Sequence, residues 1–289
     1  MHKFYKSFLI TVSRLPLGVL YGLSDIFSFF QKFVFGYRKE VVMQNLKNSF
    51  PEKSEKELKQ IYHAFFKNFY DFIIESLKGI TITQKQIDTR IEFEGIEILE
   101  KYLAQEKNIM ALCGHLFNWE WLKGLVVHVP QNDIKAVYSV PSSKLVQEII
   151  SKSREKFGGE IIPMHEAKQL INSVPQNGNS IFLMVADQSP YKMAIRYDLQ
   201  FLNQTTPVFQ GFDKIARRNN LAVVYIDIIR KGRGQFLYKI IDIQPDNEKF
   251  FENEIIHKFF NLLEKSIHKQ PSNYMWTHRR WKYKKGIDY

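Results

Sequence analysis

A histidine that directly follows an apolar run, with a carboxylate five positions later, is the feature of this chain best suited to chemistry. The run 108–113 predicts a buried strand, and His115 lies just beyond its end. A helix that starts near Asn118 would carry Glu120 in its first turn. With His115 in the turn before this helix, the Glu120 carboxylate can fix the tautomer of the imidazole. The imidazole can then take a proton from an attacking hydroxyl, so the segment predicts a general base and its orienting carboxylate.

The spacing of these two residues is not specific by itself. With 8 His and 30 acidic residues in 289 positions, about one such match is expected by chance. A second match, from His128 to Asp133, lies among loop-forming residues and has no strand that leads into a helix. The prediction for His115 therefore depends on its context.

Several further blocks of residues follow one another along the chain in a characteristic order. They are Tyr37-Arg38 with Asn45-Leu46 and Phe50-Pro51-Glu52, then Gly114-His115 with Asn118-Trp119-Glu120, Arg154 with Gly158, Asp187-Gln188, 201–211 with Thr206-Pro207, and finally Pro271, Tyr274, Trp276 and His278-Arg279-Arg280. In order and spacing these blocks resemble the lipid A biosynthesis (late) acyltransferases, within the lysophospholipid acyltransferase superfamily. The resemblance spans most of the chain.

The resemblance implies a membrane-bound O-acyltransferase that needs neither a metal nor another cofactor. Acyl carrier protein would deliver a fatty acyl thioester, and the acceptor would be a hydroxyl of a lipid A precursor. His115 would be the general base, Glu120 would hold its imidazole, and backbone N–H groups or a basic side chain would stabilise the oxyanion. The residues expected to bind substrate are Asn118, Arg154, Asp187, Gln188, Arg279 and Arg280.

Most of these side chains also have a structural alternative. Glu120 can simply place negative charge at a helix N-terminus, and Asn118 can cap that helix. Arg154 lies in the charged run 152–156 and fits either a solvated helix face or a contact with a substrate phosphate. Asp187-Gln188 either positions a substrate or merely ends a strand.

The charge balance favours anionic partners. The net charge is +11, and an anionic lipid surface or an acidic carrier protein fits it, whereas no nucleic-acid-binding motif is found. Arg279 and Arg280, with the lysines that follow them, therefore fit either a phosphate clamp or a basic tail on anionic lipid.

The composition narrows the function classes further. The chain is 45% hydrophobic and 25% charged, which is typical of a globular protein. Its single cysteine, Cys113, excludes an internal disulfide and a thiolate zinc cluster, and its apolar surroundings predict a buried side chain. No metalloprotease, phosphate-loop or serine-esterase motif occurs. Two function classes besides lipid A acylation remain: acyl transfer to another lipid, such as a phospholipid, an amino-acid lipid or a pigment, and a non-catalytic lipid-binding homologue.

The N-terminus predicts membrane association. Residues 8–35 are apolar but interrupted by Arg14, Pro16 and Asp25, so no run reaches the ~18 residues of a spanning helix. The pattern predicts a helical hairpin embedded in or lying on the membrane, with its basic flanks toward the cytoplasm. The family resemblance implies the inner membrane and an active site that faces the cytoplasm. The alternative is a buried N-terminal helix of a soluble fold. The basic residues that flank the segment are Lys3, Lys6, Lys32, Arg38 and Lys39.

The rest of the chain predicts one α/β domain. We expect a membrane-associated segment over 1–36 and a single acyltransferase domain over 37–289, with a helical lead-in (37–90) and an α/β core (91–289). A capping box, Ser54-x-x-Glu57, begins a long amphipathic helix. The predicted strands are 91–94, 108–113, 134–140, 180–186, 222–230 and 234–243, and the predicted helices of the core are 95–105, 118–127, 144–157, 166–174, 207–219 and 250–268.

This alternation of strands and helices indicates a mostly parallel central sheet flanked by helices. The last two strands, joined around 231–234, are expected to form an antiparallel hairpin. Sites in open α/β sheets lie at the carboxyl ends of strands, where His115 and Asp187-Gln188 both fall.

Overall fold

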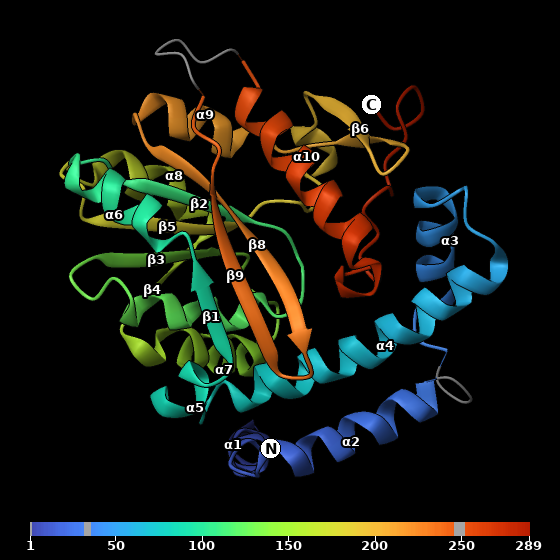
Figure 1. Ribbon diagram of the computed structural model, residues 1–289. Coiled ribbons are helices and arrows are strands. Elements are labelled where there is room, and N and C mark those ends of the chain that lie inside the picture. The colour runs from blue at the N-terminus through green and yellow to red at the C-terminus, as the bar shows by residue number, and fades with distance from the viewer. Residues whose placement is uncertain (1, 32–35, 246–251) are drawn as a thin grey trace.

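A computed structural model describes residues 2–31, 36–245 and 252–289 of the chain. Its main sheet consists of β1 (Ile91–Glu94), β2 (Ile109–Cys113), β3 (Asp133–Tyr138), β4 (Glu160–Pro163), β5 (Ser180–Val185), β8 (Ala222–Gly232) and β9 (Gln235–Asp242). Their order across the sheet is β1-β9-β8-β2-β5-β3-β4 (Figure 1). β8 and β9 are antiparallel, and the other neighbouring pairs are parallel. The predicted fold class and the predicted hairpin are thus confirmed.

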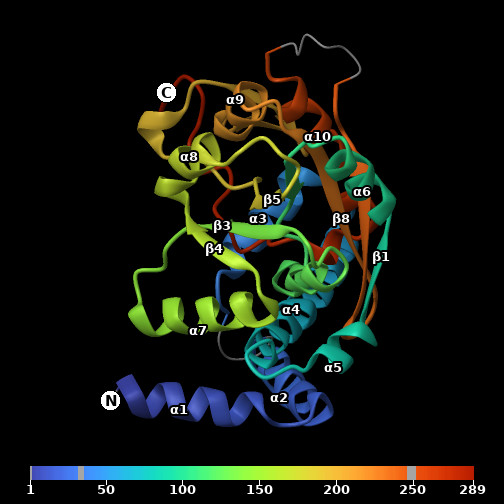
Figure 2. The ribbon, with the colours of Figure 1, turned by 90° about the vertical axis from the view of Figure 1, so that its left-hand side faces the viewer.

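The helices cover both faces of this sheet (Figures 1 and 2). They are α1 (His2–Ser13), α2 (Leu17–Phe30), α3 (Lys39–Ser49), α4 (Glu55–Lys78), α5 (Gln84–Asp88), α6 (Ile96–Ala104), α7 (Lys144–Arg154), α8 (Met164–Ser173), α9 (Gly211–Arg218) and α10 (Glu254–Lys269), with 3-10 helices η2 (Trp119–Val127), η3 (Glu155–Phe157), η4 (Lys192–Ala194) and η5 (Pro271–Asn273). The predicted helix 118–127 is therefore a 3-10 helix. The predicted helix 250–268 begins at Glu254, and its expected first residues, 250 and 251, lie outside the described residues.

Some short elements were not predicted. The strand β4 has four residues, and a separate antiparallel hairpin joins β6 (Asp198–Phe201) to β7 (Gln204–Pro207). The predicted helix 207–219 begins later, at Gly211. Strands of four residues show few alternations for a periodicity argument, and among the described strands of this length only β1 was predicted.

Helix α4 begins as predicted and supports the turn after β2. The Ser54 N–H donates to Glu57 at 2.8 Å, and the Glu57 N–H donates to the Ser54 hydroxyl at 3.3 Å, which completes the capping box. On the buried face of α4, the rings of Phe65 and Phe72 stack on Phe117, with centroid distances of 6.0 and 5.0 Å. The aromatic stripe of this helix therefore packs in the core, directly against the segment that follows His115.

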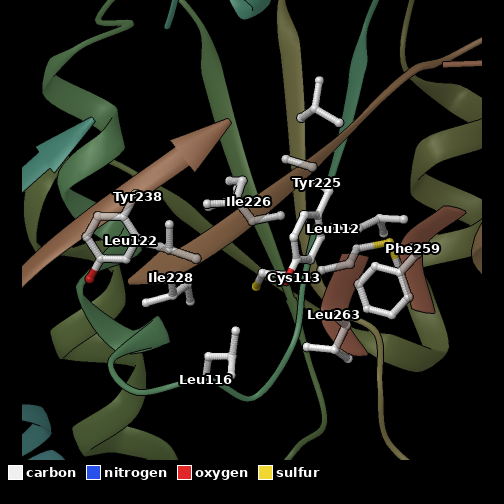
Figure 3. Packing of buried hydrophobic residues seen from close by; sticks show 14 of the residues in the cluster. Leu112, Cys113, Leu116, Leu122, Tyr225, Ile226, Ile228, Tyr238, Phe259 and Leu263 are labelled. Atoms are coloured by element: carbon white, nitrogen blue, oxygen red, sulfur yellow. The ribbon is translucent and has the colours of Figure 1, made fainter. Parts of the chain in front are cut away.

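The other side of the turn is covered by α10. Leu112 of β2 and Tyr225 of β8 pack in one buried cluster with Phe259 and Leu263 of α10 (Figure 3). A Cβ atom added to Gly114 would lie 2.4 Å from a methyl group of Leu263. Glycine at position 114 thus allows α10 to approach the turn that carries His115.

The N-terminal helices lie along one edge of the molecule, outside α4 and α7 (Figures 1 and 2). Within the described residues, no single helix has both the length and the hydropathy of a membrane span. Only a pair of helical segments, Phe4–Ser13 and Leu17–Phe30, reaches this length and hydropathy, and the two segments are bent by 113° relative to each other. Leu17, Leu20 and Ser24 of α2 are buried. Of the predicted basic flanks, Lys32 lies outside the described residues, as does the side chain of Lys3.

Candidate active site

The register of two neighbouring strands brings His115 and Asp187 together. In the parallel pair β2 and β5, Cys113 is paired with Val185, and the Ala186 N–H donates to the Cys113 carbonyl at 3.0 Å. His115 and Asp187 each lie two residues beyond this last pair. Because both strands end at the same edge of the sheet, their side chains emerge at adjacent positions.

The His115 imidazole is held at both ring nitrogens. Nδ1 lies 2.6 Å from Oδ1 of Asp187, and Nε2 lies 2.9 Å from the side-chain amide nitrogen of Gln188. Burial raises the pKa of Asp187, but His115, Arg280 and Tyr274 together hold that pKa below its usual range. An ionised carboxylate only accepts hydrogen bonds, so Nδ1 carries the proton and Nε2 accepts from the amide. In this arrangement Nδ1 faces the carboxylate and Nε2 faces the Gln188 amide, so Nε2 is the ring nitrogen placed to act as a general base.

Glu120 pairs with Arg154 and not with His115. The Arg154 guanidinium donates from Nε to Oε2 at 2.9 Å and from Nη2 to Oε1 at 2.6 Å. Burial raises the pKa of Glu120, but Arg154 outweighs it and holds that pKa below its usual range. In the described part of the chain, the carboxylate at the His115 ring belongs to Asp187. The predicted contact between Glu120 and His115 is therefore wrong, because the last residue of α7 attracts the Glu120 carboxylate.

The structure decides against one of the two alternatives considered for Arg154. Its side chain is 19% exposed, so it is not on a solvated helix face. Both oxygens of Glu120 engage its guanidinium, and its charge also lies over the Tyr138 ring, 5.9 Å from the centroid. Arg154 thus neutralises a buried carboxylate, which is the interaction that makes a buried charge tolerable.

Asn118 caps the helix that carries Glu120. Its Oδ1 accepts the Glu120 N–H at 2.9 Å, and its Nδ2 donates to Glu75 at 3.1 Å. The Tyr238 hydroxyl donates to its main-chain carbonyl at 2.8 Å. The side chain is fully buried, so the capping role is confirmed, and the predicted contact with substrate does not follow from this position.

The C-terminal segment is hydrogen-bonded to the turn and to Asp187. Tyr274 forms an antiparallel bridge with Leu116, and the Met275 N–H donates to the His115 carbonyl at 3.1 Å. The Tyr274 hydroxyl also hydrogen-bonds to the Asp187 carboxylate, which accepts the His115 main-chain N–H at 3.1 Å. The sequence did not assign Tyr274 a role at the site, although it lies in one of the blocks that carry the family resemblance.

The two arginines of the C-terminal block are placed differently. Arg279 is exposed. Arg280 is 1% exposed, and its guanidinium lies over the Phe260 ring at 5.8 Å from the centroid. Its charge contributes to lowering the pKa of Asp187. A phosphate clamp made of both side chains, as the sequence predicts in one alternative, is therefore not assembled, because Arg280 is enclosed in the core.

A cavity of about 310 Å³ lies beside His115. Its polar lining includes His115, Gln188, Glu120, Arg154 and Lys123. Most of the remaining lining is apolar, and includes Leu122, Val126, Ile134, Ala136, Ile150 and Leu183. Cavities that bind small molecules usually combine a mainly apolar wall with a few polar groups. This one suits a ligand with a polar reactive group and an apolar tail.

Two further possibilities for the chemistry can be judged from the geometry. Within residues 2–31, 36–245 and 252–289, no group of three or more His, Cys, Asp or Glu side chains is arranged to hold a metal ion. Cys113 lines the cavity, but it is 2% exposed and burial raises the pKa of its thiol. It therefore stays protonated and is a poor nucleophile, which confirms its prediction as a buried side chain.

Comparisons with known proteins identify the family of this chain. The model of the family described as bacterial lipid A biosynthesis acyltransferase matches residues 3–283. The lipid A biosynthesis lauroyltransferase of Escherichia coli (strain K12) is 24% identical over 277 residues, which are 94% of this chain and 88% of that protein. The palmitoleoyltransferase of the same organism is 19% identical over 245 residues, 85% of this chain and 79% of that protein. Lipid A biosynthesis acyltransferase 2 of Shigella flexneri is 20% identical over 247 residues, 84% and 77% of the two chains.

The family match extends over nearly the whole chain, and five residues of the blocks that carried the resemblance line the cavity, namely His115, Trp119, Glu120, Arg154 and Gln188. The chain belongs to the bacterial lipid A biosynthesis acyltransferase family and is an acyltransferase.

Proposed function

We propose that this protein transfers a fatty acyl group from acyl carrier protein to a hydroxyl of a lipid A precursor, with His115 as the general base. The observation that carries the proposal is the His115–Asp187 pair, joined at 2.6 Å, in the lining of a mainly apolar cavity. Membership of the family supports the acyl transfer and the class of acceptor. The base, its partner and the donor are the new parts of the proposal.

In the proposed reaction, Nε2 of His115 removes the proton of the acceptor hydroxyl as its oxygen attacks the thioester carbonyl carbon. A C–O bond forms, the tetrahedral intermediate collapses, and the C–S bond breaks. The imidazolium then returns the proton to the departing sulfur. Asp187 stays ionised throughout, holds the Nδ1 proton and stabilises the imidazolium.

Gln188 has to move for this reaction. Its amide now occupies Nε2 of His115 at 2.9 Å, which is the place where an acceptor hydroxyl would bind. The side chain is exposed, so it can turn aside without disturbing the core. After it has turned, its amide remains a donor beside the reacting carbon, where it can contribute to stabilising the oxyanion with the positive charge of the lining.

The cavity is the proposed site of the acyl chain. Its apolar lining would shield the hydrocarbon from water, while the thioester would lie near the His115 imidazole. The buried Glu120–Arg154 pair forms part of the polar lining. The volume of the cavity then limits the length of the chain that can be transferred.

The proposal places the enzyme on the cytoplasmic face of the inner membrane. Apolar side chains of α1 and α2, including Phe4, Phe8, Val19 and Ile26, are exposed and would face the lipid. The net charge of +11 favours both an anionic membrane surface and an acidic carrier protein. Helices α1 and α2 would lie on or in the interface.

Mass spectrometry of lipid A from a strain that lacks this protein tests the proposal. We expect the lipid A to lose one acyl chain and a plasmid that encodes the wild-type protein to restore it. Loss of an acyl group from another lipid, with lipid A unchanged, would show that the acceptor is wrong although the chemistry is right. Failure of the purified protein to acylate a lipid A precursor from acyl carrier protein would refute the donor and the activity together.

A substitution in the cavity tests where the acyl chain binds. Ala136 lies in β3 and lines the cavity, so Ala136→Leu would fill part of its volume without changing the strand. We expect the preferred acyl chain to become shorter, with about a 10-fold or larger loss in kcat/KM for the longest donor, since each methylene excluded from an apolar pocket changes this ratio by about 10-fold or more.

Ala136→Ser is the matched control, because it leaves the volume nearly unchanged and should leave the chain-length preference unchanged. The measurement is competition among acyl donors of different length. An unchanged product distribution in the folded leucine variant would place the acyl chain elsewhere.

A further inference from the structure

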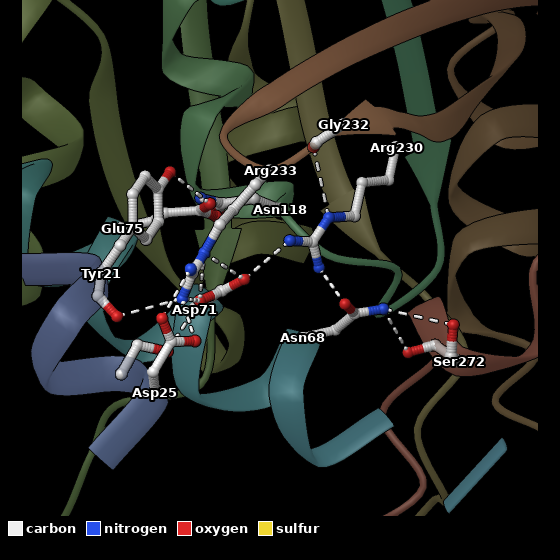
Figure 4. A network of polar contacts seen from close by, with 11 residues as sticks. Tyr21, Asp25, Asn68, Asp71, Glu75, Asn118, Arg230, Gly232, Arg233 and Ser272 are labelled. Carbon is white, nitrogen blue, oxygen red and sulfur yellow. Dashed lines mark hydrogen bonds and ion pairs between the residues drawn. The ribbon is translucent and has the colours of Figure 1, made fainter. Parts of the chain in front are cut away.

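A buried carboxylate on α4 connects the N-terminal helices to the turn that follows His115. Glu75 is 1% exposed. Its Oε1 accepts from the Tyr21 hydroxyl of α2 at 2.9 Å, and its Oε2 accepts from Nδ2 of Asn118 at 3.1 Å. Figure 4 shows the three side chains in contact. Each oxygen of this carboxylate is thus engaged by a donor from a different part of the chain.

Glu75 determines how the side-chain amide of Asn118 is oriented. A carboxylate only accepts hydrogen bonds, so the amide must turn its nitrogen toward Glu75 and its oxygen away. That oxygen accepts the Glu120 N–H at 2.9 Å and caps η2. The Trp121 indole adds a second link, because it donates to the main-chain carbonyl of Glu75 at 3.1 Å. The start of η2 therefore depends on an acceptor oxygen of the Glu75 side chain that faces Asn118.

The contact with Tyr21 is not needed to hold α2 on the domain. Ser24 donates to Asp71 at 2.7 Å. Asp25 pairs with Arg233 at 2.8 Å (Figure 4). The guanidinium of Arg233 also lies over the Tyr21 ring, 4.5 Å from the centroid. Loss of the Tyr21 hydroxyl alone leaves these contacts in place, so its hydrogen bond acts mainly on Glu75.

We propose that Tyr21 and Glu75 are positioning residues, which act through Asn118 to hold the turn between His115 and Glu120 in its active arrangement. The relay runs from α2, whose other face exposes Val19 and Ile26, to the helix that lines the cavity. This inference rests on the proposed function in one respect, because it takes the turn between His115 and Glu120 as the place where the reaction occurs.

The charge state of Glu75 makes the relay sensitive to its donors. Burial raises the pKa of Glu75 to about 7. Without the Tyr21 hydroxyl, proton uptake becomes easier still. A protonated Glu75 keeps one acceptor oxygen and gains one O–H donor. In Tyr21→Phe this O–H has lost the phenol oxygen that could accept it, so it donates to the Asn118 amide oxygen instead, and the amide turns over and stops capping Glu120. The titratable groups that face Glu75 are Tyr21 from α2, Asp71 from α4, Arg230 from β8 and Tyr238 from β9.

The test compares two conservative variants of α2. Tyr21→Phe removes the hydrogen bond to Glu75, whereas Ser24→Ala removes a similar hydroxyl–carboxylate bond between the same two helices. In full-length enzyme assayed with acyl carrier protein donors and a lipid A precursor, we expect Tyr21→Phe to lower kcat about 3- to 10-fold at pH 7 with KM unchanged. The deficit should shrink toward pH 8.5, because a higher pH restores the carboxylate. Ser24→Ala should keep the wild-type kcat.

Glu75→Gln supplies the internal control. A glutamine can accept from Asn118 and donate to the Tyr21 oxygen, since a phenol both donates and accepts. It should therefore keep kcat near the wild-type value, and in this background the effect of Tyr21→Phe should no longer depend on pH. An equal loss of kcat in Tyr21→Phe and Ser24→Ala, or a deficit that does not change with pH, would overturn the proposal.

Hydrogen exchange separates the relay from the proposed function. The Glu120 amide should exchange at least about 3-fold faster in Tyr21→Phe and at the wild-type rate in Ser24→Ala, whether or not the assayed substrates are correct. Unchanged exchange at Glu120 refutes the relay. Faster exchange together with an inactive wild-type protein refutes the proposed function and leaves the coupling between α2 and the turn in place.

Discussion

His115→Ala is expected to lower kcat for acyl transfer by about 10²–10⁴, the range typical of losing a general base. The reason is the geometry of the ring, whose Nδ1 is held by Asp187 at 2.6 Å and whose Nε2 is therefore left to accept a proton. KM for the acyl donor should change little, because the apolar lining of the cavity is untouched. Steady-state kinetics with purified enzyme, acyl carrier protein donor and lipid A precursor measures both values.

His128→Ala is the matched control, because His128 is also followed by an acidic residue five positions later. His128 packs against the Phe93 ring at 4.8 Å, away from the cavity lining. This variant should keep the wild-type kcat. A folded His115→Ala enzyme with full activity would remove the proposed base from the mechanism.

Asp187→Asn is expected to lower kcat nearly as much as His115→Ala does, on the order of 10²–10⁴-fold. The same substitution in the Ser-His-Asp triads of hydrolases has an effect of this size. The asparagine can turn its amide nitrogen toward Nδ1 and so favour the tautomer that is protonated at Nε2. It also removes the negative charge that stabilises the imidazolium. Combined with His115→Ala, the substitution should add little further loss, because two residues that act as a unit are not additive.

Glu120→Gln should behave differently. It weakens the charge-assisted contacts with Arg154, so we expect it to lower the free energy of unfolding by up to about 3–5 kcal/mol, as when a buried ion pair is broken. Its effect on kcat should multiply with that of His115→Ala, because the two side chains belong to separate pairs. The measurements are denaturant unfolding and a double-mutant cycle. The opposite result would be a loss of kcat in Glu120→Gln that does not multiply with the loss in His115→Ala, while the loss in Asp187→Asn does. Glu120 would then be the residue that orients His115.

The sequence alone determined the framework of this protein, because the framework depends on local patterns. The apolar runs that became β2 and β5 are continuous and bounded by polar residues, which is typical of strands buried on both faces. The Ser54–Glu57 capping box predicted where α4 begins. The turn residues around 232–234 likewise predicted the β8–β9 hairpin. Each of these signals involves residues close together in the chain.

Only the tertiary structure decided which carboxylate holds His115. From the sequence, Glu120 was the nearer candidate, five positions away, whereas Asp187 lies 72 positions away. The choice depends on the register Cys113↔Val185 between two parallel strands, and a shift of that register by one residue would reverse which face each side chain takes. The salt bridge of Glu120 with Arg154 depends in the same way on where α7 ends.

The position of the N-terminal helices on the domain was also decided only by the tertiary structure. From the sequence, the apolar segment interrupted by Asp25 predicts a membrane hairpin, with a buried helix as the alternative. The structure shows that the polar positions of α2 face the domain, since Ser24 and Tyr21 contact the buried carboxylates Asp71 and Glu75. Those carboxylates are unremarkable acids in an amphipathic helix when they are seen in the sequence. Their roles arise only from partners that folding brings from distant parts of the chain.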